Sequence, residues 1–356
     1  MPAPLITGWG KCLPPAVLSN ADLETLTDTS DEWIVTRTGI KERRISHAET
    51  SDLAAVAGRR ALAAAGLGPD DIDLLIVATC TPDRLVPAAA ALAQQKIGAT
   101  RAGAMDLNAA CSGFLYGLAV ADQMVRSGSM RRVLLIGAEK LHFFVDFTDR
   151  ATSVLFGDGA GAVVVEAAEE DGGLLAFELG ADGTAAEILC LPGSGTEGDP
   201  GAARRTRVQM EGPTVFRRAV EAMGDASLRV LEKAGLTLDE VDLLIPHQAN
   251  LRIIEATARR LGLDAAEVMV NVAGYGNTSA ASIPIALAEA LEQGRVPPGG
   301  LVVFAAFGGG LTWAAAAYRW GSRVVPRGTS DAALAPGERS GRELMEPNVA
   351  LYGKGV

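Results

Sequence analysis

The 356-residue chain is poor in histidine, cysteine and aromatic residues, and each scarcity argues against a class of protein. Its three histidines and four cysteines do not cluster and form no CxxC pair, which disfavours a structural zinc site. Only 5% of the residues are aromatic while 48% are hydrophobic, so Ala, Val, Leu and Ile must build the interior. The dispersed cysteines are expected to be reduced thiols rather than disulfides.

Signals for a membrane or a nucleic acid are also missing. No uninterrupted apolar run approaches the roughly 18 residues that a spanning helix needs, and the opening MPAPLITGWG does not resemble a secretory signal. With 32 Lys and Arg against 43 Asp and Glu, the formal net charge of −11 argues against nucleic-acid binding. We therefore expect a cytoplasmic protein that binds neither nucleic acid nor membrane.

Short apolar runs alternate with helical patterns along the chain. Buried strands are predicted at 72–79, 131–138, 160–167, 241–245 and 300–307. Helices are predicted at 52–65, 112–127, 214–234, 250–261 and 279–293, and four of them end at Gly66, Gly128, Gly235 and Gly294. This alternation predicts an α/β fold with covered sheets.

An internal repeat indicates two related halves. Residues 65–76 and 234–245 match at eight of twelve positions with an offset of 169. A second alignment, of the helices that end at Gly128 and Gly294, has an offset of 166 and places Cys111 opposite Asn277. We predict an N-terminal half at 1–170, a C-terminal half at 171–320, and an extension at 321–356 that is a flexible tail or a surface arm.

Cys111 has the most suggestive context of the four cysteines. It follows the strand-like segment GAMDL and a turn of small residues, and a helical pattern begins at Ser112. A thiol at a helix N-terminus is expected to have a lowered pKa and to act as a nucleophile. The alternative is a buried structural cysteine, which is our interpretation of the other three, Cys12, Cys80 and Cys190.

Three further motifs could complete a site. His247 directly follows the predicted strand 241–245, at the edge where α/β sheets place ligands. Asn277 lies in the glycine-rich turn GNTSAAS, where it could also be an ordinary turn residue. FGGGL at 307–311 exposes backbone N–H groups that suit an oxyanion hole, and the alternative is a tight hairpin. GDGAGA at 157–162 precedes a strand and is interpreted as structural.

Taken together, the motifs NAACSGF, PHQANLRI, GNTSAAS and FGGGLTW resemble the β-ketoacyl-acyl carrier protein synthase III family of the thiolase superfamily. Residues 30–45 and 147–166 look like further signatures of that family, and the resemblance runs in order from about residue 3 to 320. It implies a five-layered α-β-α-β-α fold made of two duplicated halves related by a pseudo-twofold.

The resemblance also implies a reaction. Cys111 would take an acyl group from acyl-CoA, and malonyl-acyl carrier protein would lose CO2 and condense with it to give 3-ketoacyl-acyl carrier protein. His247 and Asn277 match the residues that hold the thioester oxygen of the enolate, while the backbone N–H groups of Cys111 and Gly309 match the oxyanion hole. The resemblance implies a homodimer. It implies no metal, nucleotide cofactor or flavin.

Binding positions follow from the same resemblance. Trp33 and Arg150 match the pair that sandwiches the CoA adenine, Arg37 matches a nearby phosphate contact, and Asn250 a position near the pantetheine arm. The segments whose basic residues dock the acidic carrier protein carry Arg217, Arg252, Arg259 and Arg260. Ordinary solvated arginines are the alternative for these four.

Two departures from the family and two rival functions remain open. Val86 stands where acetyl-primed members often carry a bulky aromatic residue that reaches the partner's acyl pocket, so we expect a longer or branched starter. The extension 321–356 is absent from typical members. The near alternative is a polyketide-priming ketosynthase or an acyltransferase of the same superfamily, and the remote one is a Cys-His-Asn hydrolase.

Overall fold

The computed structural model describes residues 3–196 and 206–352. Residues 1–2 of the predicted N-terminal half and residues 197–205 of the predicted C-terminal half lie outside these ranges. Two central sheets have the strand orders β1-β7-β6-β4-β5 and β11-β12-β13-β8. The first sheet comprises β1 (Ala3–Cys12), β4 (Leu74–Ala78), β5 (Gly103–Leu107), β6 (Arg132–Lys140) and β7 (Asp158–Ala168). The second comprises β8 (Gly173–Ala181), β11 (Leu243–Pro246), β12 (Leu301–Gly308) and β13 (Thr312–Arg319).

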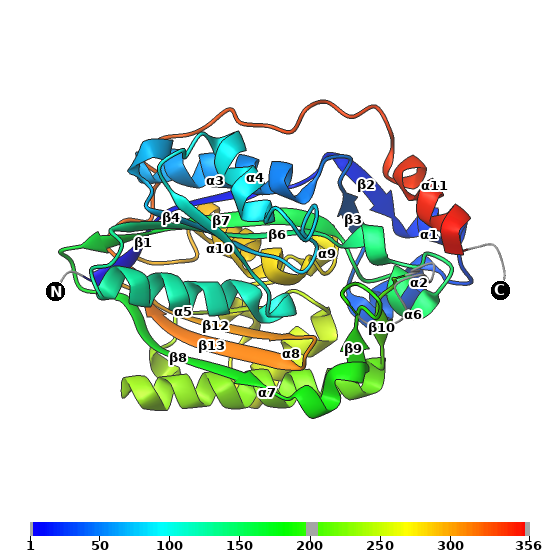
Figure 1. Cartoon of the computed structure of the whole chain (residues 1–356). Helices are drawn as coiled ribbons and strands as arrows, with labels where there is room; N and C mark the ends of the chain where they lie inside the picture. The colour runs from blue at the N-terminus through cyan, green and yellow to red at the C-terminus, as the bar shows by residue number, and fades with distance from the viewer. Residues whose placement is uncertain (1–2, 197–205, 353–356) are drawn as a thin grey trace.

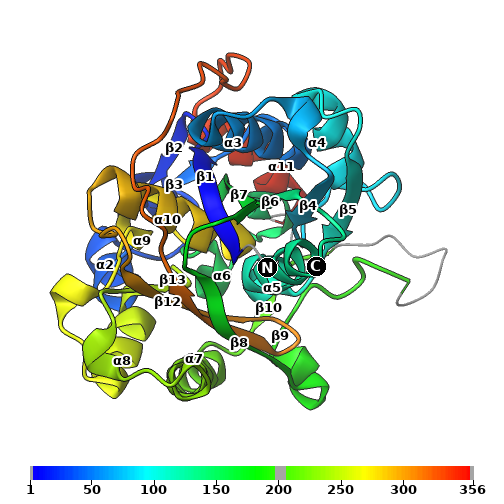
Figure 2. The ribbon, with the colours of Figure 1, turned by 90° about the vertical axis from the view of Figure 1, so that its left-hand side faces the viewer.

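Helices form three layers around the two sheets (Figure 1). The outer face of the first sheet is covered by α3 (Thr50–Ala65) and α4 (Ala89–Ile97), and the outer face of the second by α7 (Gly212–Ala234) with α8 (Leu251–Leu261) beside it. Between the sheets lie α5 (Gly113–Arg126) and α10 (Ser282–Glu292). Figure 2 shows the same layers from the side. This arrangement confirms the predicted five-layered α/β fold.

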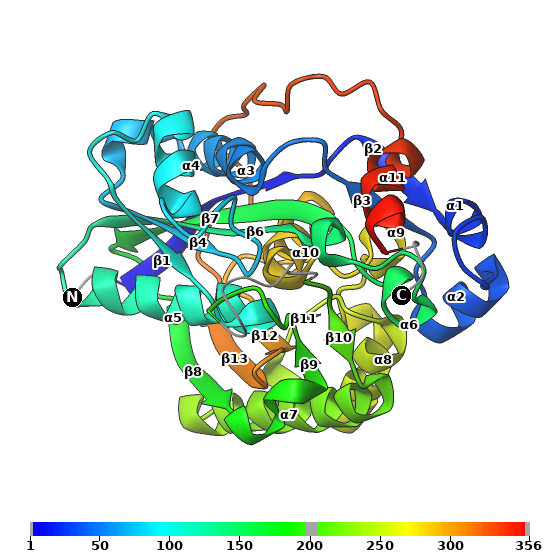
Figure 3. The same ribbon diagram turned by 45° about the vertical axis from the view of Figure 1, so that its right-hand side comes forward.

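Smaller elements gather at one end of the layers (Figure 3). They are the strands β2 (Ala16–Ser19), β3 (Glu42–Ile45), β9 (Leu189–Cys190) and β10 (Gln209–Met210), and the helices α1 (Asn20–Glu24), α2 (Asp31–Thr38), α6 (Arg150–Ser153), α9 (Val272–Tyr275) and α11 (Gly341–Tyr352). In the ranges 3–196 and 206–352, no helix combines the length and apolar character needed to cross a bilayer.

All five predicted strands and all five predicted helices are present, but β1, β8 and β13 of the central sheets were missed, as were the short strands β2, β3, β9 and β10. In β1 and β8, glycines and polar residues interrupt the apolar pattern that would indicate a strand. Gly8 and Gly10 interrupt β1 because α3 lies directly on it: an added Cβ would lie 2.2 Å from the Ala61 oxygen and 2.6 Å from the Ala57 oxygen, respectively. The GDGAGA segment lies at the start of β7, as its structural interpretation predicted.

The two interior helices begin with the same turn. A short 3-10 helix precedes each of them: η2 (Ala110–Ser112) before α5 and η7 (Ser279–Ala281) before α10. Ala110 and Ser279 both have positive φ, at 46° and 48°. Their backbone N–H groups donate to the side-chain oxygens of Asn108 and Asn277, at 3.0 and 2.9 Å. This repeated turn supports the predicted duplication of the chain, which stays a prediction.

The register of the repeat differs from one alignment used above. Helices α5 and α10 begin at Gly113 and Ser282, 169 residues apart, so Cys111 corresponds to Ala280. The alignment that placed Cys111 opposite Asn277 is therefore wrong by three residues. It was anchored on the glycines after the two helices, and α10 has 11 residues where α5 has 14.

The described part of the C-terminal extension is a surface arm and not a flexible tail (Figure 1). The backbone N–H of Arg327 donates to the Ala64 oxygen at 2.9 Å, and the Arg60 side chain donates to the Ala332 oxygen at 3.1 Å. The arm ends in α11, whose Met345 is fully buried. Residues 353–356 of the predicted extension lie outside the described ranges.

The contact between β6 and η7 depends on Gly137, where an added Cβ would lie 2.2 Å from the Ala280 oxygen. We expect Gly137→Ala to lower the free energy of unfolding by about 1–3 kcal/mol through overpacking. Gly183→Ala is the control, because no atom lies within 4 Å of its added Cβ, and it should change stability by under about 0.5 kcal/mol. Denaturant unfolding measures both, and equal stabilities would contradict the packing argument.

Candidate active site

A cavity of about 1380 Å³ brings most of the predicted site residues together. Its lining includes Cys111, His247, Asn277, Gly309, Trp33, Arg37, Arg150, Asn250 and Arg252. Of the other predicted positions, Val86, Arg217, Arg259 and Arg260 are not among the described lining residues. The motifs come from both halves of the chain and meet between the two sheets.

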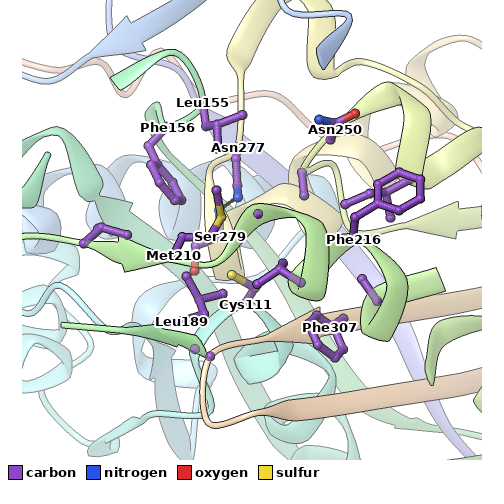
Figure 4. Close-up of a pocket in the computed structure, with 18 of the residues that line it drawn as sticks. Cys111, Leu155, Phe156, Leu189, Met210, Phe216, Asn250, Asn277, Ser279 and Phe307 are labelled. Carbon is purple, nitrogen blue, oxygen red and sulfur yellow. Dashed lines mark hydrogen bonds between the residues drawn. The ribbon is translucent and has the colours of Figure 1, made fainter. Parts of the chain in front are cut away.

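Cys111 is buried in η2, immediately before α5. In Figure 4 it lies in the cavity with Asn277 and Ser279 on one side and Phe307 on the other. The Ser279 hydroxyl and the backbone N–H groups of Cys111 and Gly309 are the polar groups that lower the pKa of its thiol. The two predicted oxyanion-hole groups are thus both among the groups that act on the sulfur, and their role as oxyanion hole stays a prediction.

The electrostatic environment of Cys111 differs from the expectation. Burial raises the pKa of Cys111 to about 11, although the Ser279 hydroxyl and the two backbone N–H groups favour the thiolate. The prediction of a lowered pKa for this thiol is therefore wrong. Desolvation of the buried thiolate outweighs the nearby donors.

His247 follows β11 and is held by a serine of α10. Its Nδ1 lies 2.7 Å from the Ser282 hydroxyl, which also accepts from the Gln248 backbone N–H at 3.4 Å. We assign the Ser282 hydroxyl as donor to Nδ1, which leaves the proton on Nε2. Burial lowers the pKa of His247 to about 4, so the imidazole is neutral near pH 7.

Asn277 is oriented by its own turn. Its backbone N–H donates to the Leu155 oxygen at 2.8 Å, and its side-chain oxygen accepts from the Ser279 N–H at 2.9 Å. Its oxygen is engaged by the backbone, and Asn277 lines the cavity. His247 and Asn277 thus both line the cavity, and each side chain carries an N–H group without a charge near pH 7.

The sequence reasoning missed Glu139, which is fully buried beside the site. It accepts hydrogen bonds from the Thr81 hydroxyl at 2.6 Å and the Ser279 hydroxyl at 3.0 Å, and its burial raises its pKa. Its place near the end of β6 was an available signal, because ligands bind beyond the carboxyl ends of such strands. Two cysteines interpreted as structural, Cys80 and Cys190, also line the cavity, and the Cys80 thiol donates to Glu139 at 3.4 Å.

At the mouth of the cavity, two arginines contact Trp33. The guanidinium of Arg150 lies 4.8 Å from the ring centroid and that of Arg37 lies 5.7 Å from it. A planar group that enters between Arg150 and Trp33 must therefore separate them. Asn250 begins α8 and donates to the Arg37 oxygen at 3.1 Å, which ties α8 to α2.

The four arginines of α7 and α8 that were predicted to dock the carrier protein are all exposed, but they are not equivalent. Arg252 lies 5.6 Å over the ring of Phe216. Arg259 and Arg260 each form an ion pair with an acidic neighbour. In the described ranges, Arg217 and Arg252 form no salt bridge, so they are the more available cations.

Val86 lies on an exposed loop together with Leu85, with 85% and 76% of their surfaces accessible. It does not reach the cavity of its own chain. Its predicted contact with a partner's acyl pocket stays a prediction.

Solved structures place this fold in a known class. The 3-oxoacyl-(acyl carrier protein) synthase III of Aquifex aeolicus matches with a TM-score of 0.85 and 48% identity, over 89% of this chain and 100% of that one. The priming β-ketosynthase of the R1128 polyketide pathway matches with a TM-score of 0.85 and 39% identity, over 90% of this chain and 97% of that one. Fold and site therefore define a thiolase-like condensing enzyme.

Sequence comparison gives the family. Residues 105–183 match the model described as 3-oxoacyl-[acyl-carrier-protein (ACP)] synthase III, and residues 231–320 match its C-terminal model. The β-ketoacyl-[acyl-carrier-protein] synthase III 2 of Vibrio vulnificus is 51% identical over 348 residues, 97% of this chain and 96% of that protein. The chain belongs to the β-ketoacyl-acyl carrier protein synthase III family, and it is an acyltransferase. The Vibrio match extends well into residues 321–356, so the arm is not unique to this chain.

The lowered pKa of His247 predicts a pH dependence of stability. The unfolded chain binds this proton below about pH 6.5 and the folded chain only below about pH 4. The stability that neutral His247 contributes is therefore complete above pH 6.5 and is lost as the pH falls to 4, by up to about 3 kcal/mol. In His247→Gln we expect this part of the acid destabilisation to disappear.

Denaturant unfolding of wild type and variant between pH 7 and pH 4 measures the effect as a difference between two curves. His47→Gln is the control and should follow the wild type. Parallel curves for wild type and His247→Gln would contradict a neutral buried imidazole.

Proposed function

We propose that the site transfers an acyl group from acyl-CoA to Cys111 and condenses it with malonyl-acyl carrier protein. The products are 3-ketoacyl-acyl carrier protein, CoA and CO2, and the reaction begins fatty acid or related polyketide synthesis. One observation carries this proposal: a single cavity holds the Cys111 thiol, the two backbone N–H groups that act on it, and the neutral side chains of His247 and Asn277. Membership of the family supports the reaction class.

In the first half-reaction, Cys111 sulfur bonds to the thioester carbonyl carbon. The oxygen becomes an oxyanion, and the backbone N–H groups of Cys111 and Gly309 are placed to stabilise it. When the intermediate collapses, the bond to the CoA sulfur breaks and the proton of Cys111 leaves with CoA. Because the thiolate is the attacking form and the pKa of Cys111 is raised, the thiol must give up its proton as the new carbon–sulfur bond forms, and the departing CoA sulfur takes up that proton.

In the second half-reaction, the malonyl thioester oxygen accepts from His247 Nε2 and Asn277 Nδ2. The bond between the methylene carbon and the carboxylate breaks, CO2 leaves, and the electron pair passes into an enolate held by these two donors. The carbanion then attacks the acyl group on Cys111, and collapse of this second oxyanion breaks the C–S bond and releases the product. The Cys111 thiolate left behind takes up one proton from solvent, which restores the resting thiol. The low pKa of His247 suits a donor that remains neutral throughout.

This scheme uses acyl-CoA and malonyl-acyl carrier protein as substrates and needs no metal or organic cofactor. We propose that Trp33 and Arg150 separate to hold the CoA adenine, with Arg37 on a phosphate and Asn250 along the pantetheine arm. We further propose that the enzyme works in the cytoplasm as a homodimer, with Val86 at the partner's acyl pocket and a longer or branched starter accepted there.

The two half-reactions can be separated by mutation. Cys111→Ser should lose the mass increase that acyl-CoA produces on the intact protein. His247→Ala and Asn277→Ala should keep that increase but lose about 100-fold or more in CO2 release from malonyl-acyl carrier protein, as expected when a preorganised donor is removed. Cys190→Ser is the control and should keep the adduct. An adduct that persists in Cys111→Ser would refute the assigned nucleophile.

Carrier-protein docking predicts a different kinetic effect. We propose that Arg217 and Arg252, with Arg259 and Arg260, orient the acidic carrier protein outside the cavity. Arg217→Glu should raise KM for malonyl-acyl carrier protein about tenfold at low salt, with a smaller effect at high salt, and leave acylation by acyl-CoA unchanged. The matched control is the exposed Arg101→Glu. Equal KM values for the two variants would contradict a docking surface on α7 and α8.

A further inference from the structure

The C-terminal helix α11 packs against the part of the chain that forms one wall of the cavity. Its buried Leu344 and Met345 belong to the same apolar cluster as Leu141 and Val208, and both of these line the cavity. Figure 3 shows α11 next to β2 and β3, at the end of the molecule where β9 and β10 lie. The helix therefore lies behind the wall and contributes no lining residue of its own among those described.

Asn348 of α11 holds the 3-10 turn η3 (Leu141–Phe144), which begins with a lining residue. Its Nδ2 group lies 2.6 Å from the His142 oxygen, 3.2 Å from the Phe143 oxygen and 3.2 Å from the Val145 oxygen. An amide directed at three carbonyls of one turn fixes the path of that turn. It adds to the bond within the turn itself, in which the Val145 N–H donates to the His142 oxygen at 3.2 Å.

The turn η3 also holds the segment 206–210, which contributes residues to the cavity lining. The Val208 N–H donates to the Phe144 oxygen at 2.9 Å, and Arg207 forms an ion pair with Asp146 at 2.7 Å. At the end of α11, the Tyr352 hydroxyl donates to the Thr206 oxygen at 2.6 Å. Helix α11 thus reaches this segment twice, once directly through Tyr352 and once through η3.

The segment held in this way supplies Val208 and Met210 to the cavity. Met210 pairs with Leu189 in the ribbon of β10 and β9, which has only two residues in each strand. Figure 4 shows Leu189 and Met210 close to Cys111. So short a ribbon is not stable by itself, and its position depends on what anchors it.

We propose that α11 positions this wall and thereby determines which acyl chains Cys111 accepts, with Asn348 and Tyr352 as positioning residues. The inference rests on the proposed role of Cys111 as the acyl carrier. A fixed wall discriminates between acyl groups by packing closely around one size. Loss of the anchors lets the ribbon adapt to chains of other lengths, so discrimination between starters decreases.

The test compares Asn348→Ala, Tyr352→Phe and the double variant with wild type. Neither change removes the buried Leu344 and Met345, and Tyr352→Phe keeps the ring. The matched control is Glu346→Ala, an exposed residue of the same helix. For each protein, kcat/KM is measured with acetyl-, isobutyryl-, hexanoyl- and octanoyl-CoA at fixed malonyl-acyl carrier protein, together with Tm and the mass of acylated Cys111.

We expect the ratio of kcat/KM between the best and the worst starter to decrease by about threefold to tenfold in each anchor variant, the factor that a net hydrogen bond corresponds to. Glu346→Ala should keep the wild-type ratio. A lower Tm with an unchanged ratio would show that α11 only stabilises the fold, and would overturn the proposal. Failure of every starter to acylate wild-type Cys111 would instead overturn the proposed function, and this inference with it.

Discussion

The contact between the two turns that begin α5 and α10 is the constraint on which the site depends. The strands beside this contact require glycine at two positions. At Gly137 an added Cβ would clash with the Ala280 oxygen, and at Gly308 it would lie 2.6 Å from the Cys111 nitrogen. The close packing of these backbones brings the Cys111 thiol to the Ser279 hydroxyl and the Gly309 N–H. Chemistry that needs groups from both sheets is possible only because backbone meets backbone there.

Burial gives the site its electrostatic character. The same desolvation that raises the pKa of Cys111 lowers that of His247, so both groups are uncharged near pH 7. Glu139, also buried, satisfies its oxygens with local donors and holds Ser279 between itself and Cys111. In such a cavity, fixed neutral donors stabilise the negative charge that develops during the reaction. Before the reaction, Cys111 and His247 themselves carry no charge.

Much of this could be predicted from the sequence, because local context was informative at the strand ends. The placement of His247 after a strand and of Cys111 before a helix needed only short patterns. The hold of Ser282 on His247 and of Asn348 on η3 could not be foreseen, since each joins residues far apart in the chain. The pKa of Cys111 was misjudged because a helix terminus can be recognised in the sequence whereas the depth of burial cannot. Helix α11 was missed because Pro347 lies inside it, which is a signal against a helix, and because its buried residues pack against distant elements.

The most direct test of the central claim is the stoichiometry of the wild-type reaction. Acyl-CoA and malonyl-acyl carrier protein labelled in the free carboxyl group are mixed, and labelled CO2, released CoA and 3-ketoacyl-acyl carrier protein are counted in the same sample. The account predicts equimolar amounts of all three, with no CO2 above background in Cys111→Ser. Release of CoA and free acid from acyl-CoA, without CO2 or a 3-ketoacyl product, would show a hydrolase and contradict it.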